Sequence, residues 1–580
     1  MIIPAPWRQG AVFLAVACLA ASQPARAQAV VGMPLSQQVN AARVLEAMLA
    51  ANAAAPEAAA PPATHGAVAS DAARDDAATL LVTGFRITGN SVFGDAELQP
   101  LLAAWVGKRL GTDQLLDATE AIRNRYKDAG YFLTEVLVPP QRPQDGIVTL
   151  RVVEARLGKA RGQVDSHRVD AARVDAYLRL LPEGAALTEQ DVQRPLLLIS
   201  DLPGVQLEST LSPGARPGEA DLLVNVKDAG RVVKADAYAD NAGTSETGRV
   251  RLGADLRADG PAGLGESWWL GGLVSQGGGV KAVRAALTLP VGDAGTKATA
   301  SLTHIDYHLL GSQLAALDAN GRAEVAALDI RHPVVRSRNL NLFADLGAAV
   351  LDVDDRELGG SIAAHRVLPV VDLGLDGDFR DERWGGSVNT YSAKVNVGNT
   401  GLRSSAQVAA DQAPSGHRTR GAFERLEGAY QRLQGFGATT SVRLGVRGQL
   451  AFQNLDASQK ASLGGPDGVR AFATGDGVGD DVFLGTLEVR QGIPAWTLAG
   501  APVLLSAFVD GGRVRNWHQP TAFDAANLQT LGGYGVGLNL SRRDDFQFRL
   551  DLAQKINRHA ASVSDAGRTH VWVSLTESFR

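Results

Sequence analysis

Residues 546–554, which read FQFRLDLAQ, alternate large apolar side chains with polar or charged ones. Successive side chains of a β-strand point to opposite faces, so this segment predicts a strand with one apolar face and one charged face. The apolar face carries Phe546, Phe548, Leu550 and Leu552, and the other carries Gln547, Arg549 and Asp551. The same alternation occurs in VRLGVRGQL, residues 442–450, and in FLGTLEVR, residues 483–490. Faces that carry so many charges need water or ionic partners.

This alternation continues from Arg231 toward the C-terminus, with Gly, Asp and Asn clusters between the strands. A soluble β-sandwich has the same period of two, so periodicity alone does not separate the two classes. Three features favour a membrane barrel: a signal peptide, the lack of a helical interruption, and apolar faces that would otherwise cover a very large sheet surface. Because a sheet spans lipid only when it is closed, we predict an all-β transmembrane barrel over residues 229–580. Bacterial barrels have even strand numbers, and the length leaves roughly 12 to 16 antiparallel strands open.

The signal peptide is predicted at residues 1–27. MIIPAPWRQG precedes the apolar run AVFLAVACLAA, and Ala25-Arg26-Ala27 has the small residues of a cleavage site. Lipidation of Cys18 is the alternative. Cleavage removes Cys18, the only cysteine of the chain, so we expect no disulfide and no thiol chemistry. The formal net charge of −5 argues against nucleic acid as a partner.

An amphipathic helix is predicted within residues 28–52. Apolar residues recur there near helical spacing, at Leu35, Val39, Ala42, Leu45 and Leu49. Residues 53–79 are rich in Ala, Pro and Asp and too poor in large apolar residues to fold, which predicts a disordered linker. The helix would be roughly 25 Å long, close to the roughly 25 Å apolar band of a membrane barrel. We therefore expect the tethered helix to rest in the lumen as a plug.

Residues 80–228 have the pattern of two small α+β modules. In the first, residues 80–155, a strand, two helices and two strands follow one another, and Pro139-Pro140 separates the last two strands. The second, residues 156–228, repeats the plan more loosely, with a helix that Thr188 caps and strands near 205–211 and 221–227. Two unrelated α+β domains are the alternative reading.

A glycine-rich connection lies between two of the predicted barrel strands. It reads SLGGPDGVRAF, residues 462–472, and places Arg470 between Val469 and Phe472. A cation held on a tightly turned loop needs an anionic partner, and Asp510 in AFVDGGRV is a candidate. On its strand Asp510 shares a face with Ser506 and Phe508. A surface hairpin tip with an exposed arginine is the alternative.

Several motifs carry a family resemblance over nearly the whole chain. VTGFRITGNSVF and DAGYF resemble polypeptide-transport-associated (POTRA) domains. ADNAGTSETGRVRLGADL, residues 239–256, together with SLGGPDGVRAF and FVDGG, resembles the outer-membrane transporters of two-partner secretion, the haemolysin-activator and filamentous-haemagglutinin-transporter family. The resemblance implies 16 strands, two POTRA domains and a loop that folds back into the barrel. The family's tip has a glycine where this chain has Ala471.

The resemblance implies export of one large, partly unfolded partner protein from periplasm to cell surface without nucleotide hydrolysis. Outer-membrane lipids and, during biogenesis, the barrel-assembly machinery would be further partners. Barrels commonly end in an aromatic residue that this machinery recognises, and here Phe579 is penultimate. We expect the second module to bind the extended partner at the sheet edge with Val205, Leu207 and Leu211. The loop-to-wall lock is assigned to Val469, Arg470, Phe472 and Asp510.

The alternative functions are a factor that inserts other barrels into the outer membrane and, in another class, a passive solute porin. No nucleophile with a convergent base and no Walker-type loop is evident, so we expect no enzyme and no cofactor. His304, Asp306 and His308 share one face of a strand, which we expect to be the lumen face rather than a metal site. Residues 351–355, LDVDD, lack the pattern of a calcium loop and predict a solvated turn.

Overall fold

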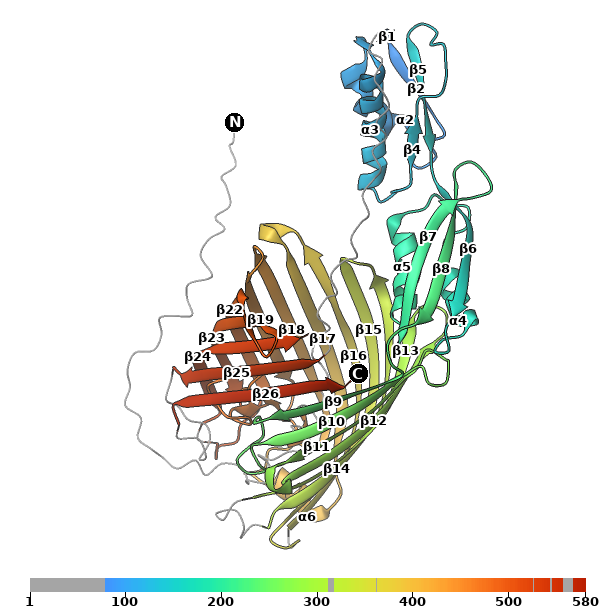
Figure 1. The fold of residues 1–580 in the computed structure, drawn as a ribbon. Helices are drawn as coiled ribbons and strands as arrows, with labels where there is room; N and C mark the ends of the chain where they lie inside the picture. The colour runs from blue at the N-terminus through green and yellow to red at the C-terminus, as the bar shows by residue number, and fades with distance from the viewer. Residues whose placement is uncertain are drawn as a thin grey trace.

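The computed structural model describes residues 79–310, 318–360, 362–524, 526–542, 545–556 and 567–579. The predicted signal peptide (1–27) and plug helix (28–52) lie outside the described residues. So does the predicted linker (53–79), apart from Thr79. Two α+β domains stand at one end of a large barrel (Figure 1). We call that end the near end and the opposite one the far end.

The first domain packs one long helix against a three-stranded sheet. The sheet has the order β2-β5-β4, with β2 and β5 parallel. The fully buried Ile122 and Tyr126 of α3 contribute to its core. The elements are β1 (Leu80–Val82), β2 (Gly84–Thr88), α2 (Asp95–Leu98), η2 (Gln99–Trp105), β3 (Lys108–Leu110), α3 (Thr112–Asp128), β4 (Glu135–Leu137) and β5 (Ile147–Val153).

The second domain has a sheet of order β6-β8-β7 and two helices. Its core includes Leu222, Val224 and Val226 of the central strand, which are buried. Thr188 caps α5 in a reciprocal arrangement with Asp191. In the described part of the chain β7 pairs with β8 alone, so its other edge is open. The elements are β6 (Arg156–Asp165), α4 (Ala171–Leu178), α5 (Glu189–Ser200), β7 (Val205–Pro213) and β8 (Glu219–Asp228).

Sixteen antiparallel strands form the closed barrel, which confirms the strand number that the resemblance implied. The last strand, β26, closes it by pairing with β9, from Ser574 opposite Asp240 to Phe579 opposite Ala235 (Figure 1). The first eight strands are β9 (Val233–Asp240), β10 (Arg251–Asp259), β11 (Ser267–Ser275), β12 (Val280–Val291), β13 (Thr296–His308), β14 (Asn320–Arg336), β15 (Leu340–Glu357) and β16 (Ile362–Asp381). The other eight are β17 (Ser387–Leu402), β18 (Gly421–Phe436), β19 (Thr440–Ala451), β22 (Asp481–Leu498), β23 (Ala501–Arg515), β24 (Leu528–Arg542), β25 (Phe546–Lys555) and β26 (Thr569–Phe579).

Short elements occupy the connections. At the far end α6 (Ser405–Gln412) follows β17, and β20 (Ala461–Ser462) and β21 (Val478–Gly479) pair within the connection between β19 and β22. Three single 3-10 turns complete the described elements: η3 (Gln276–Gly278), η5 (Arg383–Gly385) and η6 (Ala457–Gln459). None of the described helices has the length and apolarity that a membrane-spanning helix needs.

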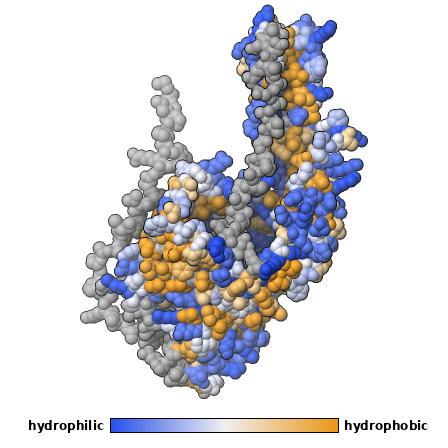
Figure 2. All heavy atoms as spheres, viewed as in Figure 1, coloured by the Kyte–Doolittle hydropathy of each residue, from blue (hydrophilic) through white to orange (hydrophobic). Residues whose placement is uncertain are grey.

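The barrel wall is apolar outside and polar inside. In β25 the outward Leu552 is 43% exposed, whereas its neighbour Asp551, which points into the lumen, is 1% exposed. Apolar residues gather over the outer surface of the barrel, and polar residues cover much of the rest of the visible face (Figure 2). A closed sheet with an apolar exterior is the form in which strands span a lipid bilayer.

The prediction that His304, Asp306 and His308 face the lumen was wrong. They share the outward face of β13 with Leu302, which is 66% exposed, and the intervening Ile305 is buried on the inner side. These polar residues occupy the far end of the strand, where they pair with polar residues of β14. The physical reason is that the outer face can be polar where a strand extends beyond the apolar belt.

The predicted solvated turn at residues 351–355 was also wrong, because the segment lies within β15. Asp355 points into the lumen, where it accepts a hydrogen bond from Tyr307 and pairs with Arg366. Asp352, on the other face, contacts His365 across the strand pair at 2.8 Å. Long strands carry acidic residues here because each carboxylate has a partner on a neighbouring strand.

Candidate functional site

The connection between β19 and β22, residues 452–480, folds back into the barrel and ends in a compact tip. The β20–β21 pair closes the base of the tip, with Ala461 opposite Gly479. Gly465 has a φ of 114°, a conformation that favours glycine. At Gly468 a Cβ atom would lie 2.0 Å from the carbonyl oxygen of Leu463, so a larger residue does not fit. Gly465 and Gly468 are therefore the two positions at which this turn depends on glycine.

The tip presents Arg470 to Asp510 on the wall strand β23. Arg470 is 2% exposed and Asp510 is 1% exposed. Nε and Nη2 of Arg470 donate to the two carboxylate oxygens at 2.8 and 2.9 Å, and the backbone N–H of Arg470 donates to Oδ2 at 3.2 Å. Two parallel hydrogen bonds make this the strong, directional form of an arginine–carboxylate pair. The structure thus brings the two residues together, and their role in function stays a prediction.

Further groups around Arg470 were not identified from the sequence. Its Nη1 donates to Glu488 of β22 at 2.8 Å and lies 4.0 Å from Asp551 of β25. The indole N–H of Trp572 donates to the carbonyl oxygen of Arg470 at 2.6 Å. The guanidinium carbon is 3.3 Å from the ring centroid of Phe508. Strand parity places Glu488 and Asp551 on the lumen face, and that signal could have nominated both as partners.

Two more arginines balance the acidic side of this cluster. Arg490 contacts Glu488 at 2.7 Å, and Arg549 contacts Asp551 at 2.7 Å. Carboxylates that carry a negative charge in a buried place need such partners, because an unpaired buried charge is costly. We call Arg470, Asp510, Glu488 and Asp551 the lumen lock.

Apolar side chains seal the lumen lock from water. Val469, Ala471 and Phe472 of the tip are fully buried. They pack in one cluster with wall residues that include Leu484, Phe508, Val514, Leu531 and Ala553. Of the predicted lock residues, Val469 and Phe472 therefore make packing contacts, while Arg470 and Asp510 form an ion pair. A pair that is desolvated in this way costs more to break than one in a wet lumen.

Ala471 replaces a glycine without backbone strain. It is absent from the described residues that have a positive φ. Space for its Cβ comes from Gly533 of β24, where an added Cβ would lie only 2.4 Å from the Cβ of Ala471. The methyl group at position 471 is thus matched by a missing one on the wall.

A second buried ion pair fastens the base of the same connection. Nζ of Lys460 lies 2.9 Å from Oδ1 of Asp480, and both side chains are almost fully buried. The same Nζ lies 3.1 Å from the ring centroid of Trp517, in the connection after β23. Burial lowers the pKa of Lys460 to about 8. The ion pair closes the β19–β22 connection, and the contact of Lys460 with Trp517 joins it to the connection after β23; nothing in the local sequence pattern indicated either contact.

The predicted partner-binding residues lie on the open-edged strand β7. Val205 and Leu207 are half-buried and pack against the core of the second domain, while Leu211 is 36% exposed. Any ligand at this edge would therefore meet backbone groups and Leu211 rather than the side chains of Val205 and Leu207. Within the described residues we find no cluster of His, Cys, Asp and Glu that could hold a metal ion.

Two family models match the chain. One, described as "POTRA domain, ShlB-type", matches residues 80–155, and the other, "Haemolysin secretion/activation protein ShlB/FhaC/HecB", matches residues 218–540. A curated relative is the heme/hemopexin transporter protein HuxB of Haemophilus influenzae. It is 24% identical over 489 residues, which cover 83% of this chain and 84% of the relative.

Solved structures show the same fold. CdiB from Escherichia coli matches with a TM-score of 0.69 and 18% sequence identity, over 94% of this chain and 99% of that chain. BamA from Haemophilus ducreyi, in a form lacking POTRA domains 1–3, matches with a TM-score of 0.51 and 15% identity, over 86% of this chain and 100% of that chain. At these identities the likeness concerns the fold alone.

Proposed function

The chain belongs to the haemolysin secretion/activation family ShlB/FhaC/HecB, and from that premise we propose that it is an outer-membrane pore that exports one large partner protein. The near end with its POTRA domain faces the periplasm, and the far end faces the cell surface. The partner enters from the periplasm in an extended state and leaves at the surface. No nucleotide is needed, because the pore offers a path and the folding of the partner outside can draw it through.

The lumen lock is the observation that carries this proposal. A solute porin needs an open lumen. Here a loop crosses into the lumen and is held by a bidentate pair between Arg470 and Asp510, which are only 2% and 1% exposed. The wall is closed by its own strand pairing, from β9 round to β26. The loop can therefore rearrange without opening the wall, which suits a channel that admits a polypeptide only on demand.

The second α+β domain is the partner receptor in this proposal, and we assign it as a second POTRA domain. Its plan repeats that of the first domain, and the outer edge of β7 is open in the described structure. An unfolded partner can add to that edge through backbone hydrogen bonds, which tolerate varied side chains. The backbone of residues 205–211 makes the contact, and Leu211 is the exposed side chain beside it.

Site-directed photo-crosslinking tests the receptor edge. A photoreactive residue at Leu211 should capture the partner during secretion, whereas the same residue at Leu223 should not. Leu223 is the matched control because it is 39% exposed, close to the 36% of Leu211, but lies on the central strand β8. Equal capture at both positions would contradict strand addition.

The predicted plug helix, residues 28–52, lies outside the described residues, and we propose that it occupies the lumen at rest. Its estimated length of roughly 25 Å is comparable to the apolar band of a barrel. Deletion of residues 34–51 should raise single-channel conductance in planar bilayers while secretion continues. An unchanged conductance would place the helix elsewhere.

The function itself is tested by secretion in a heterologous host. Cells receive this chain together with the large exported protein encoded beside its gene, and the partner is measured in the medium and on the cell surface. We expect export with the intact chain and none when residues 156–227 are deleted from a barrel that still reaches the membrane. A periplasmic enzyme measured in the medium controls for leakage. Export without the chain would refute the proposal, and a general loss of other barrels in its absence would favour an assembly factor.

A further inference from the structure

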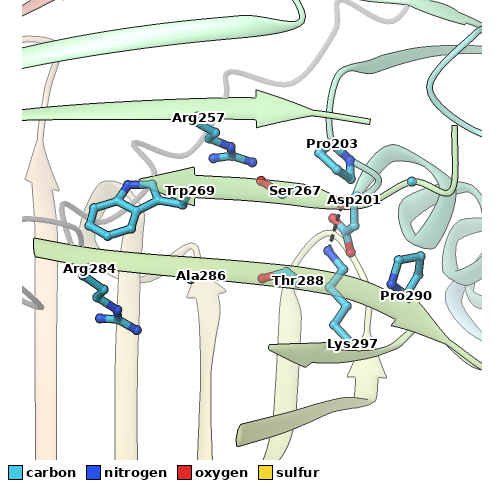
Figure 3. Close-up of a pocket in the computed structure, with 11 residues that line it drawn as sticks. Asp201, Pro203, Arg257, Ser267, Trp269, Arg284, Ala286, Thr288, Pro290 and Lys297 are labelled. Carbon is cyan, nitrogen blue, oxygen red and sulfur yellow. Dashed lines mark hydrogen bonds between the residues drawn. The ribbon is translucent and has the colours of Figure 1, made fainter. Parts of the chain in front are cut away.

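A cavity lined by both charged and apolar residues lies where the second domain meets the barrel wall at the near end (Figure 3). Its volume is about 460 Å³, within the roughly 300–1,000 Å³ typical of ligand sites. The α5–β7 connection contributes Asp201 and Pro203, the β10–β11 connection contributes Gly265, and the lumen face of β10–β13 contributes the rest. The wall residues at its centre are Arg257, Trp269, Arg284, Pro290 and Lys297. We call this cavity the entry pocket.

The entry pocket has more cations than carboxylates to neutralise them. Of the cations that line it, Arg257 is paired with Asp259 at 2.7 Å. The lining carboxylate, Asp201, is already held by Arg336, which donates from Nε and Nη2 at 2.8 and 2.7 Å. Lys297 donates to the backbone oxygen of Asp201 at 2.8 Å, and that acceptor is neutral. Among the described residues Arg284 has only a long contact, 3.5 Å, to the hydroxyl of Ser301, and its buried Nε has no hydrogen-bond partner. A buried donor without an acceptor is costly, so this site favours an added anion.

An aromatic ring stands between the arginines of the entry pocket. Trp269 pairs across the strands with Arg257, and the guanidinium carbon of Arg284 is 5.8 Å from the Trp269 ring centroid (Figure 3). Pro203 and Pro290 add apolar surface to the lining beside Asp201 (Figure 3). The pocket therefore suits an anionic group that is carried on a chain with some apolar surface, rather than a free inorganic ion.

The entry pocket also lies between the start of β7 and the lumen. Pro203 lines it, and β7 begins two residues later at Val205. A strand added to the open edge of β7 would end beside the pocket, and the lumen lies behind it. The pocket thus lies between the edge of β7, which we propose binds the backbone of the partner, and the lumen, through which the side chains of the partner must pass.

We propose that the entry pocket receives the carboxylate side chains, Asp or Glu, of the extended partner and passes them from β7 into the lumen. Arg284 is the main ligand of the carboxylate, and Lys297 contributes charge. This inference rests on the proposed function, since it takes the exported partner as its ligand. It adds a side-chain preference to a receptor that otherwise reads backbone alone.

Peptide binding to the full-length protein in detergent tests the inference. The probe is a fluorescent peptide of Gly, Ser and Thr that carries Glu, compared with a peptide that has Gln in its place. We expect about tenfold tighter binding of the acidic peptide, as for one charge-assisted hydrogen bond, and loss of the preference in Arg284→Gln. Arg447→Gln is the matched control, because Arg447 is also a half-buried lumen arginine but lies on β19, away from the pocket.

The outcomes separate the inference from the function on which it rests. If the wild-type chain exports its partner but binds both peptides equally, or if Arg447→Gln removes the preference as well, the entry pocket is not the acidic receptor. Displacement of the peptide by acetate at the same carboxylate concentration would show that a free anion suffices, and would overturn the polypeptide part. If the wild-type chain exports no partner, the proposed function fails whatever the peptides do.

Discussion

Two arginines in the same lumen, Arg470 and Arg284, have opposite surroundings. At the lumen lock the guanidinium of Arg470 is buried, makes two hydrogen bonds to Asp510 and a third to Glu488, and is sealed by apolar side chains. At the entry pocket Arg284 is half-buried, and the described structure gives it no carboxylate within hydrogen-bonding distance. The guanidinium donors of Arg470 are satisfied by carboxylates of the protein, whereas Arg284 has a buried donor, Nε, without an acceptor among the described residues.

The contrast indicates how a charged lumen can be divided between structure and binding. A cation whose donors are satisfied by the protein's own carboxylates fixes a loop, because moving it means breaking several bonds at once. A cation with a buried, unused donor gains by binding an anion that arrives from outside. Residue type alone does not separate these roles, whereas the number of acceptors around each guanidinium does.

The largest expected effect comes from breaking the lumen lock on its acidic side. Asp510→Ala leaves Arg470 buried without its main partner, which costs about 3–5 kcal/mol, so the loop should leave the lumen while the wall stays closed. Trypsin added to intact cells should then cut within residues 460–470, which contain Lys460 and Arg470. Asp376→Ala is the control, since Asp376 also pairs with an arginine, at 2.6 Å from Arg331, but far from the loop. Cutting in both variants, or in neither, would contradict the account.

A smaller effect is expected from the wall opposite Ala471. Gly533→Ala places a methyl group 2.4 Å from the Cβ of Ala471, an overpacking that costs about 1–3 kcal/mol. The variant should unfold at a lower temperature, measured as the temperature at which the folded band on a gel is replaced by the unfolded band. Adding Ala471→Gly should restore most of the loss, because it removes the other methyl group. A double variant no better than the single one would show that the two residues do not share this contact.

Arg336→Ala should have a modest effect that concerns the entry pocket. Its bidentate pair with Asp201 joins the barrel to the second domain and is partly exposed, so we expect about 1 kcal/mol. Distances between spin labels on the second domain and the barrel should broaden, while the labels within the barrel stay as they were. An unchanged distance distribution would mean that other contacts, such as those of Arg194 with Pro333 and Val334, suffice.

The smallest effect is a pH dependence of stability in the first domain. There the carboxylate of Glu154, like that of Asp510 in the lumen lock, accepts several hydrogen bonds from the protein. Burial alone would raise the pKa of Glu154, but hydrogen bonds from Ser91, Val92 and Tyr126 hold that pKa below its ordinary value. A lowered folded-state pKa gives stability that is present at neutral pH and lost as the pH falls through the ordinary and then the folded pKa.

Hydrogen exchange in the full-length protein measures this pH effect. Protection of the amides around Ser91 should decrease on acidification, after correction for the intrinsic exchange rate. In Glu154→Gln the protection should be lower at neutral pH and should change little with pH. A wild-type protein whose protection does not fall on acidification would contradict the assignment.

The strand pattern could be predicted because it is local. The period of two in residues 546–554 fixes which side chains share a face, and the same period in AFVDGGRV put Asp510 on one face with Phe508. Both side chains are buried in the structure. The number of strands came from the family resemblance, since periodicity counts segments poorly. Residues 1–78 and the predicted helix within them lie outside the described residues.

Other features depend on the closed barrel and could not be predicted. Strand parity places Glu488 and Asp551 on the lumen face, but which lumen residues meet Arg470 depends on the register of β22, β23 and β25 and on where the tip of the loop folds back. Gly533 compensates for Ala471 from a strand about sixty residues away, a match that local sequence cannot show. The face of His304 was misjudged because the period does not reveal where the lipid belt ends.

Secretion by Arg470→Lys tests the central claim most directly, at equal amounts of folded barrel in the outer membrane. Lysine keeps the charge but cannot make two parallel hydrogen bonds to Asp510. If the lumen lock sets whether the pore works, the partner in the medium should fall nearly as far in Arg470→Lys as in Arg470→Ala. Wild-type secretion by both variants would contradict the claim and leave the loop as packing alone.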